Sequence, residues 1–124
     1  MPSVLIVDDD VNLLHGLRRV LRAQPYELFS ANSAEMAIAM YQRQPFDLVV
    51  TDQKMDGKSG TELVQWIAEY FPNTVRIMLT GHADVDVMKQ AINDGRVFRF
   101  LTKPCRDVDL AVAIRDGLET QSAV

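Results

Sequence analysis

Residues 4–10 read VLIVDDD, so four consecutive strand-forming apolar residues run directly into three aspartates. An uninterrupted Val/Ile/Leu run of this length is typical of a strand that is buried on both faces of a parallel sheet. Leu14, Leu17 and Leu21 then repeat at helical spacing, with arginines on the opposite side. A buried strand followed by an amphipathic helix predicts the first βα unit of an α/β protein.

This alternation of a short apolar run with a longer helix-period segment continues to the end of the chain. The five expected strands cover residues 4–7, 26–31, 46–51, 75–79 and 97–101. Ser33, Ser59 and Asp84 are expected to cap helices, and Gly95 is expected to end one in the left-handed conformation. We therefore predict a doubly wound, flavodoxin-like three-layer α/β/α sandwich, with a five-stranded parallel sheet in the order 2-1-3-4-5.

Length and composition favour one globular domain. The 124 residues include 13 Lys and Arg against 17 Asp and Glu, a formal net charge of −4 that argues against direct binding to nucleic acid or an anionic membrane. We expect one domain over residues 1–124, with its core at about 3–119 and a frayed tail or linker start at 120–124. The single cysteine, Cys105, and the lack of a long apolar run favour a cytoplasmic location.

The carboxyl ends of parallel strands open onto one edge of the sheet, where ligands bind. The residues that follow the strands are Asp8, Asp9 and Asp10 after the first, Asp52 after the third, Thr80 after the fourth and Lys103 after the fifth. Clustered carboxylates either raise a pKa or recruit a cation, and for a cation oxygen ligands without His or Cys favour Mg²⁺, with Mn²⁺ as a substitute. One carboxylate can then attack phosphorus while the lysine stabilises the transferred oxygens, so the pattern predicts phosphoryl transfer to an aspartate.

Taken singly, each of these features has a plainer interpretation. The acidic triplet can be a solvated strand end with Asp10 as N-cap, and Asp52 can be a turn former. Thr80-Gly81 alone is a common turn, and Lys103-Pro104 alone is an ordinary loop. The combination at four separate strand ends is what favours the chemical interpretation.

At these positions the sequence resembles response-regulator receiver domains, the phosphoacceptor part of two-component signalling. The resemblance extends from Val4 to about Leu118. It rests on five stretches in order, at residues 5–10, 48–52, 55–60, 78–81 and 100–104.

The resemblance implies a role for each acidic residue. Asp52 would accept a phosphoryl group from a histidine kinase or a phosphotransfer protein. Asp9 would bind Mg²⁺ directly, Asp8 would act largely through water, and Asp52 and the main-chain carbonyl of Lys54 would complete the protein ligands.

The resemblance also implies a switch. Lys103 would contact the phosphoryl group and precede a cis bond to Pro104. Thr80 would move toward a phosphoryl oxygen and Phe100 would rotate inward behind it, which would alter the surface of the fourth helix, fifth strand and fifth helix. That surface would control an output domain or effector protein. The domain would catalyse its own phosphorylation and autodephosphorylation without being an enzyme of the ordinary kind.

One departure from the family pattern concerns the loop after Asp52. Asp56 stands where the family often has a proline after Met55, which predicts a looser loop. Lys54 places a second ammonium in the same loop.

Three other functions compete with a phosphorylated receiver. A pseudo-receiver would use the same fold only as a protein-interaction module, but it would typically lack the lysine or the nucleophile. A flavodoxin-type cofactor binder and a phosphatase of the haloacid-dehalogenase type fit less well, because the triplet would repel a metal-free phosphate and the chain is too short for a capping domain.

The output is open at this point. The stretch at residues 95–104 resembles receivers of larger regulators, with phosphodiesterase or transcription-activating outputs. A phosphorylation-dependent homodimer is a further possibility, with a candidate face at Arg96, Arg99, Asp109 and Arg115.

Overall fold

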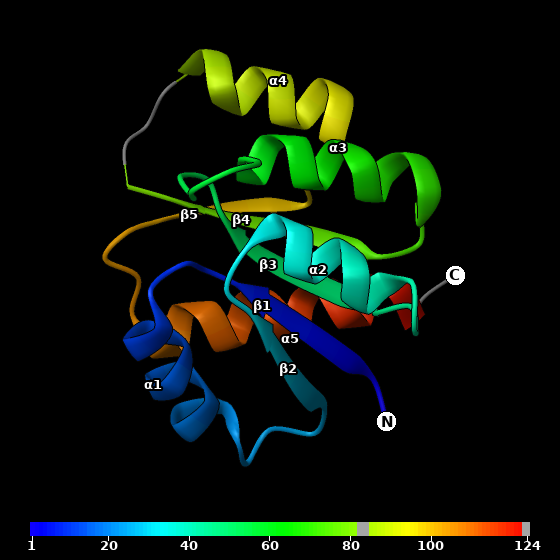
Figure 1. Cartoon of the computed structure of the whole chain (residues 1–124). Coiled ribbons are helices and arrows are strands. Elements are labelled where there is room, and N and C mark those ends of the chain that lie inside the picture. The colour runs from blue at the N-terminus through cyan, green and yellow to red at the C-terminus, as the bar shows by residue number, and fades with distance from the viewer. Residues whose placement is uncertain (82–84, 123–124) are drawn as a thin grey trace.

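The structure, a computed structural model, describes residues 1–81 and 85–122, in which strands and helices alternate (Figure 1). The strands are β1 (Ser3–Val7), β2 (Glu27–Ala31), β3 (Leu48–Asp52), β4 (Val75–Thr80) and β5 (Arg99–Thr102). The helices are α1 (Val11–Leu21), α2 (Ala34–Tyr41), α3 (Gly60–Tyr70), α4 (Val85–Gly95) and α5 (Asp107–Ser122). The repeated βα pattern is thereby confirmed.

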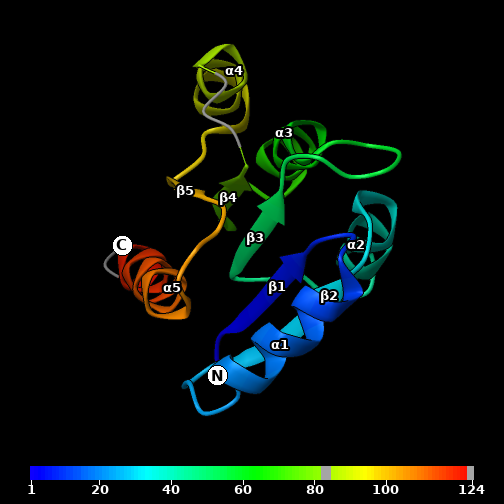
Figure 2. The same cartoon turned by 90° about the vertical axis from the view of Figure 1, so that its left-hand side faces the viewer.

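All strand pairs are parallel, and the sheet order is β2-β1-β3-β4-β5, as predicted. Helices α1 and α5 cover one face, and α2, α3 and α4 cover the other (Figure 2). This is the doubly wound three-layer sandwich expected from the sequence. Because every strand points the same way, the residues at the carboxyl ends of β1, β3, β4 and β5 meet at one edge.

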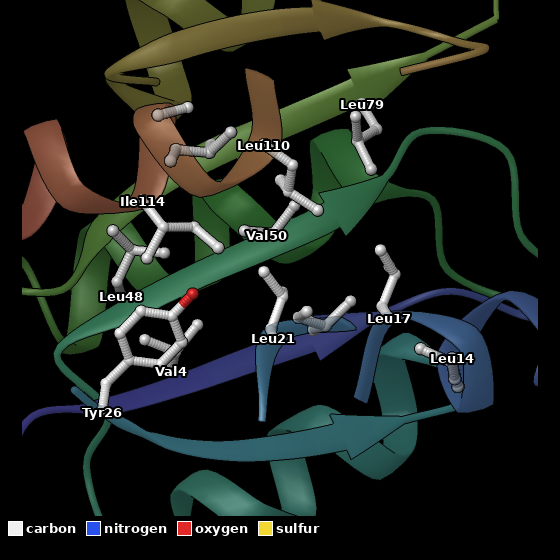
Figure 3. Close-up of a cluster of buried hydrophobic side chains, with 13 residues drawn as sticks. Val4, Leu14, Leu17, Leu21, Tyr26, Leu48, Val50, Leu79, Leu110 and Ile114 are labelled. Atoms are coloured by element: carbon white, nitrogen blue, oxygen red, sulfur yellow. The ribbon is translucent and has the colours of Figure 1, made fainter. Parts of the chain in front are cut away.

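Strand β1 shows why its apolar run has no polar interruption. Val4 and Ile6 pack into the core between the sheet and helices α1 and α5, whereas Leu5 and Val7 pack into the core beneath α2 and α3. All four are at most 2% exposed. Figure 3 shows the first of these cores. Leu21 of α1 and Ile114 of α5 lie in the same cluster as Val50 of the central strand β3.

The helix starts follow the predicted caps. Asp10 caps α1 by accepting a hydrogen bond at 3.2 Å from the backbone N–H three residues on. Ser33 caps α2 in the same way, and Ser59 with Glu62 forms the predicted capping box of α3. Asp84, the predicted cap of α4, lies outside the described residues.

The predicted end of α4 was wrong by one residue. Gly95 lies inside the helix, and the left-handed position falls on Arg96, whose φ is 50°. The next chain segment must then enter the sheet, where the Phe98 N–H donates to the carbonyl of Arg76 at 2.7 Å. This long-range bond fixes where the chain turns, and β5 begins two residues later than expected.

We expect Arg96→Gly to stabilise the fold by about 1 kcal/mol, because glycine adopts a positive φ without the Cβ strain of arginine. Urea denaturation of both proteins measures the difference. Arg96→Ala is the matched control, since it removes the charge near Arg76 but keeps the Cβ. An Ala variant as stable as the Gly variant would assign the gain to charge and contradict the backbone explanation.

The C-terminal segment also differs from expectation. Helix α5 continues through Ser122, beyond the expected core limit at residue 119. The Gln121 side-chain amide donates to the carbonyls of Asp47 (3.2 Å) and Asn73 (3.0 Å), which ties this turn to the body of the domain. Within residues 1–81 and 85–122, no helix has the length and apolar character needed to cross a membrane.

Candidate functional site

Three carboxylates meet at the carboxyl edge of the sheet. Asp8 follows β1, Asp9 comes next, and Asp52 is the last residue of β3. One oxygen of each lies within 4.8 Å of the others, with Asp8 and Asp52 buried and Asp9 exposed. Asp10 is not part of this group, because its side chain caps α1. The acidic triplet therefore divides into two cluster residues and one cap.

Lys103, from the segment between β5 and α5, bridges two of these carboxylates. Its Nζ lies 2.9 Å from Oδ2 of Asp8 and 3.0 Å from Oδ2 of Asp52. Two backbone features accompany this approach: the Lys103 N–H donates to the carbonyl of Thr80 at 2.9 Å, and the Lys103–Pro104 peptide bond is cis. The tertiary fold thus brings an ammonium group across 95 residues of sequence to the acidic cluster.

The charges in this cluster are unbalanced. Burial raises the pKa of Asp52 above its ordinary 3.8; the hydrogen bond from Lys103 opposes this shift, and the charge of Asp8 adds to it. Burial alone would lower the pKa of Lys103, but its hydrogen bonds to Asp8 and Asp52 raise it above 10.5. Lys103 has two carboxylate partners, whereas Asp8 and Asp52 share a single ammonium group. A second cation would therefore relieve the repulsion that remains between the carboxylates.

The raised pKa of Asp52 predicts a pH-dependent loss of stability. Below pH 3.8 the carboxyl is protonated in both states. Above that pH the unfolded chain loses its proton first, so stability falls until the folded pKa is passed and then stays lower. In metal-free buffer at pH 7 we expect Asp52→Asn to melt above wild type, because a neutral amide replaces a carboxylate whose charged form is disfavoured by burial.

Thermal melts at pH 3 and pH 7 test this explanation. The two proteins should melt together at pH 3, and equal melting at pH 7 would contradict the unbalanced cluster.

The remaining predicted residues lie on β4, on β5 and in the segment after Asp52. Thr80 is buried at the end of β4, directly after Leu79, which pairs with Asp52. Phe100 of β5 is half-buried and packs against Val64 and Met78. Lys54 is exposed in the segment that follows Asp52.

Two residues next to the cluster were missed by the sequence analysis. Gly60 begins α3, and a Cβ added there would overlap the carbonyl oxygen of Asp52. Gln53 receives three hydrogen bonds from the first turn of α3: its carbonyl accepts from Gly60 N at 3.0 Å, and its Oε1 accepts from Thr61 N at 2.8 Å and Oγ1 at 2.6 Å. In the sequence, the only local signal of this close approach is that Gly60 directly follows Ser59, the predicted N-cap.

Three residues of the candidate dimer face make ion pairs within the chain. Arg99 and Arg115 contact Asp116 at 2.9 Å and 3.4 Å, and Asp109 contacts Arg106 at 2.9 Å. These exposed pairs contribute little to stability. They show that Arg99, Asp109 and Arg115 already have charged partners within the chain.

The fold and these contacts define a flavodoxin-like α/β domain with an acidic, lysine-bridged cluster at the carboxyl edge of its sheet. Comparison with known proteins identifies its family: the family model described as "Response regulator receiver domain" matches residues 4–115. The chain therefore belongs to the receiver domains of two-component response regulators.

Individual proteins show the same likeness. The hydrogenase transcriptional regulatory protein HoxA of Cupriavidus necator is 30% identical over 96% of this chain and 24% of its own length. The transcriptional regulatory protein GlrR of Escherichia coli K12 is 38% identical over 97% of this chain and 27% of its own length. This chain thus spans about a quarter of these relatives.

A solved structure of similar size also matches. The CheY-like response regulator receiver domain protein of Methanospirillum hungatei JF-1 superimposes with a TM-score of 0.94 at 29% identity, covering 99% of this chain and 98% of that one.

Proposed function

We propose that this receiver domain accepts a phosphoryl group on Asp52 in a reaction that requires Mg²⁺. The observation that supports this most directly is the bridging ammonium of Lys103, 2.9 Å from Asp8 and 3.0 Å from Asp52. This bridge supports the proposal because it joins a carboxylate that would act as the nucleophile to an ammonium group, beside two further carboxylates that would help to bind the ion.

The acidic residues fit a divalent ion with oxygen ligands. Asp8, Asp9 and Asp52 each offer an oxygen within 4.8 Å of the others. Both oxygens of Asp8 already accept hydrogen bonds, from Lys103 Nζ and from the Asp10 N–H at 2.9 Å, which supports an indirect role through water. Asp9, Asp52 and the Lys54 carbonyl would be the direct ligands. Bound Mg²⁺, or Mn²⁺ in its place, would neutralise negative charge on the phosphoryl oxygens.

The chain's own residues divide the transfer between them. An oxygen of Asp52 attacks phosphorus while the P–N bond of the kinase phosphohistidine breaks, and the imidazole leaves and takes up a proton from solvent. Lys103 moves its contact from the carboxylates to a phosphoryl oxygen, and the Thr80 hydroxyl donates to another. In the autodephosphorylation that we also propose, water attacks the same phosphorus, the bond between phosphorus and the Asp52 oxygen breaks, and inorganic phosphate leaves while a proton passes to solvent and the carboxylate is free again.

Phe100 is our candidate for passing this change to the surface. It is half-buried against Val64 and Met78, and we propose that it rotates inward when Thr80 moves. The new phosphoryl contacts would favour one of two arrangements of α4, β5 and α5. A histidine kinase or phosphotransfer protein would supply the phosphoryl group, and an output domain or effector would bind the altered surface.

The proposal also covers the output that the domain controls, its oligomeric state and its cellular location. Both relatives described above are transcriptional regulators, which supports a receiver that controls a separate output and does not itself bind nucleic acid. Homodimerisation on phosphorylation stays a prediction. The single cysteine supports a cytoplasmic location.

Intact-mass measurement tests the proposal. Wild type and Asp52→Asn are incubated with acetyl phosphate, with Mg²⁺ or with a chelator. We expect the wild type to gain one phosphoryl group only when Mg²⁺ is present, and the variant to gain none. Equal labelling of the variant would exclude Asp52 as the acceptor. No labelling of the wild type under any condition would favour the pseudo-receiver.

A further inference from the structure

We propose that Glu35, in the first turn of α2, is a positioning residue for the loop at residues 53–59 and thereby strengthens Mg²⁺ binding. The inference rests on the proposed function, because that loop carries the Lys54 carbonyl assigned to the metal. Neither the sequence pattern nor the family resemblance singled out this residue.

The contact itself joins two segments that are distant in sequence. Oε1 of Glu35 accepts a hydrogen bond from the Lys58 backbone N–H at 2.9 Å, across 23 residues. A hydrogen bond to an ionised acceptor is stronger than one between neutral groups. Glu35 also lies in the first turn of α2, where a negatively charged side chain interacts favourably with the helix dipole.

The loop conformation is adapted to this carboxylate. Gly57, directly before the bonded amide, has a φ of +80°, a conformation that glycine adopts without strain. A Cβ on Gly57 would lie 2.9 Å from both Oε1 and Oε2 of Glu35. The glycine therefore allows the turn and also leaves the space that the carboxylate occupies.

Glu35 completes a set of contacts along the loop. Gln53 is bonded to the first turn of α3 at the start of the loop, and Met55 packs against the core beneath α2 and α3. Between Met55 and the start of α3, Asp56 is exposed at the position where the family often has a rigid proline. The Glu35 hydrogen bond constrains this stretch, so we infer that it supplies part of the rigidity that a proline at position 56 would give.

The consequence concerns the Lys54 carbonyl. A metal ligand supplied by a constrained loop loses less conformational freedom on binding than one supplied by a loose loop. Removal of the Glu35 bond would therefore weaken Mg²⁺ binding without changing any of the ligands.

Four proteins test this inference: wild type, Glu35→Ala, Glu35→Gln and Glu69→Ala. The Gln variant removes the charge but keeps an oxygen that can accept from Lys58. Glu69→Ala removes an equal charge from an exposed position in the last turn of α3. Amide hydrogen exchange at Lys58 and Mg²⁺ affinity by calorimetry, both without a phosphodonor, are the two measurements.

We expect Glu35→Ala to lose protection of the Lys58 amide and to bind Mg²⁺ roughly three- to tenfold more weakly, the effect of one hydrogen bond to an exposed charged group. Glu35→Gln should lie between wild type and Glu35→Ala in both properties, because its amide oxygen still accepts from Lys58 but carries no charge, and Glu69→Ala should match wild type. Phosphorylation of Glu35→Ala should be slow at limiting Mg²⁺ and reach the wild-type rate at saturation.

Unchanged affinity in Glu35→Ala would overturn the inference, and so would a Gln variant as weak as the Ala variant, which would indicate a charge effect. A wild type that binds no Mg²⁺ would overturn it together with the metal site. A wild type that binds Mg²⁺ but accepts no phosphoryl group would overturn the proposed function, while the affinities would still decide the role of Glu35.

Discussion

Lys103→Met is expected to lower the free energy of unfolding by about 2–3 kcal/mol in metal-free buffer, because it leaves two carboxylates facing each other without a cation. The side chains of Asp8 and Asp52 are only 2% and 11% exposed, so water cannot replace the ammonium group. The 30% exposure of the lysine places the loss below that of a fully buried pair. Urea denaturation at pH 7 in EDTA measures it.

Mg²⁺ should restore much of this stability, since an ion between the carboxylates supplies the missing positive charge. Phosphorylation should nevertheless remain at least roughly 100-fold slower than in wild type, because the lost ammonium group also stabilises the transferred oxygens. Lys89→Met, at an exposed position of α4, is the matched control and should leave both properties unchanged. A Lys103→Met protein as stable as wild type in EDTA would show that the bridge does not hold the cluster together.

Gly60→Ala is expected to cost about 2–3 kcal/mol of stability through overpacking and to slow phosphorylation of Asp52. The added Cβ would overlap the Asp52 carbonyl oxygen and lie 2.9 Å from its carbonyl carbon and 3.0 Å from the Cα of Gln53. These are backbone atoms, which cannot rotate away as a flexible side chain can. Either α3 or the end of β3 must shift, and the acceptor carboxylate moves with it.

Gly16→Ala provides a matched control in another helix. No neighbouring heavy atom lies within 4 Å of a Cβ added at Gly16 in α1. The same change there should stabilise the fold by about 0.5–1 kcal/mol, through the higher helix propensity of alanine. Thermal melts and acetyl phosphate labelling of both variants make the comparison. A Gly60→Ala protein that melts and reacts like wild type would contradict the close approach of α3 to Asp52.

Much of the fold was predictable because the relevant signals are local. Val4 to Val7 form an apolar run that is typical of a strand buried on both faces, and the helix caps at Ser33 and Ser59 depend on residues within three positions. The parallel sheet then made Asp52 and Lys103 neighbours in the prediction, because all its strands end at one edge.

The details of the site depended on contacts between residues distant in sequence, which hydrophobic periodicity does not reveal. Local pattern alone could not decide which aspartates of the triplet form the cluster, since Asp9 and Asp10 are chemically identical; only the family resemblance assigned Asp8 and Asp9 to the metal and left Asp10 out. It placed the left-handed residue at Gly95 because glycine favours that conformation, whereas the bond between Phe98 and Arg76 moved the turn to Arg96. In that case a tertiary contact outweighed a backbone preference of about 1 kcal/mol.

The sequence by itself therefore determined the order of elements, the layers and the chemical types at the edge of the sheet, because hydrophobic periodicity and strand direction decide these. Only the tertiary structure decided that Lys103 bridges Asp8 as well as Asp52, that Gly60 touches the Asp52 backbone, and that Glu35 holds the neighbouring loop. These contacts join residues 8 to 95 positions apart, and their geometry exists only once the packed helices and strands have brought those residues together.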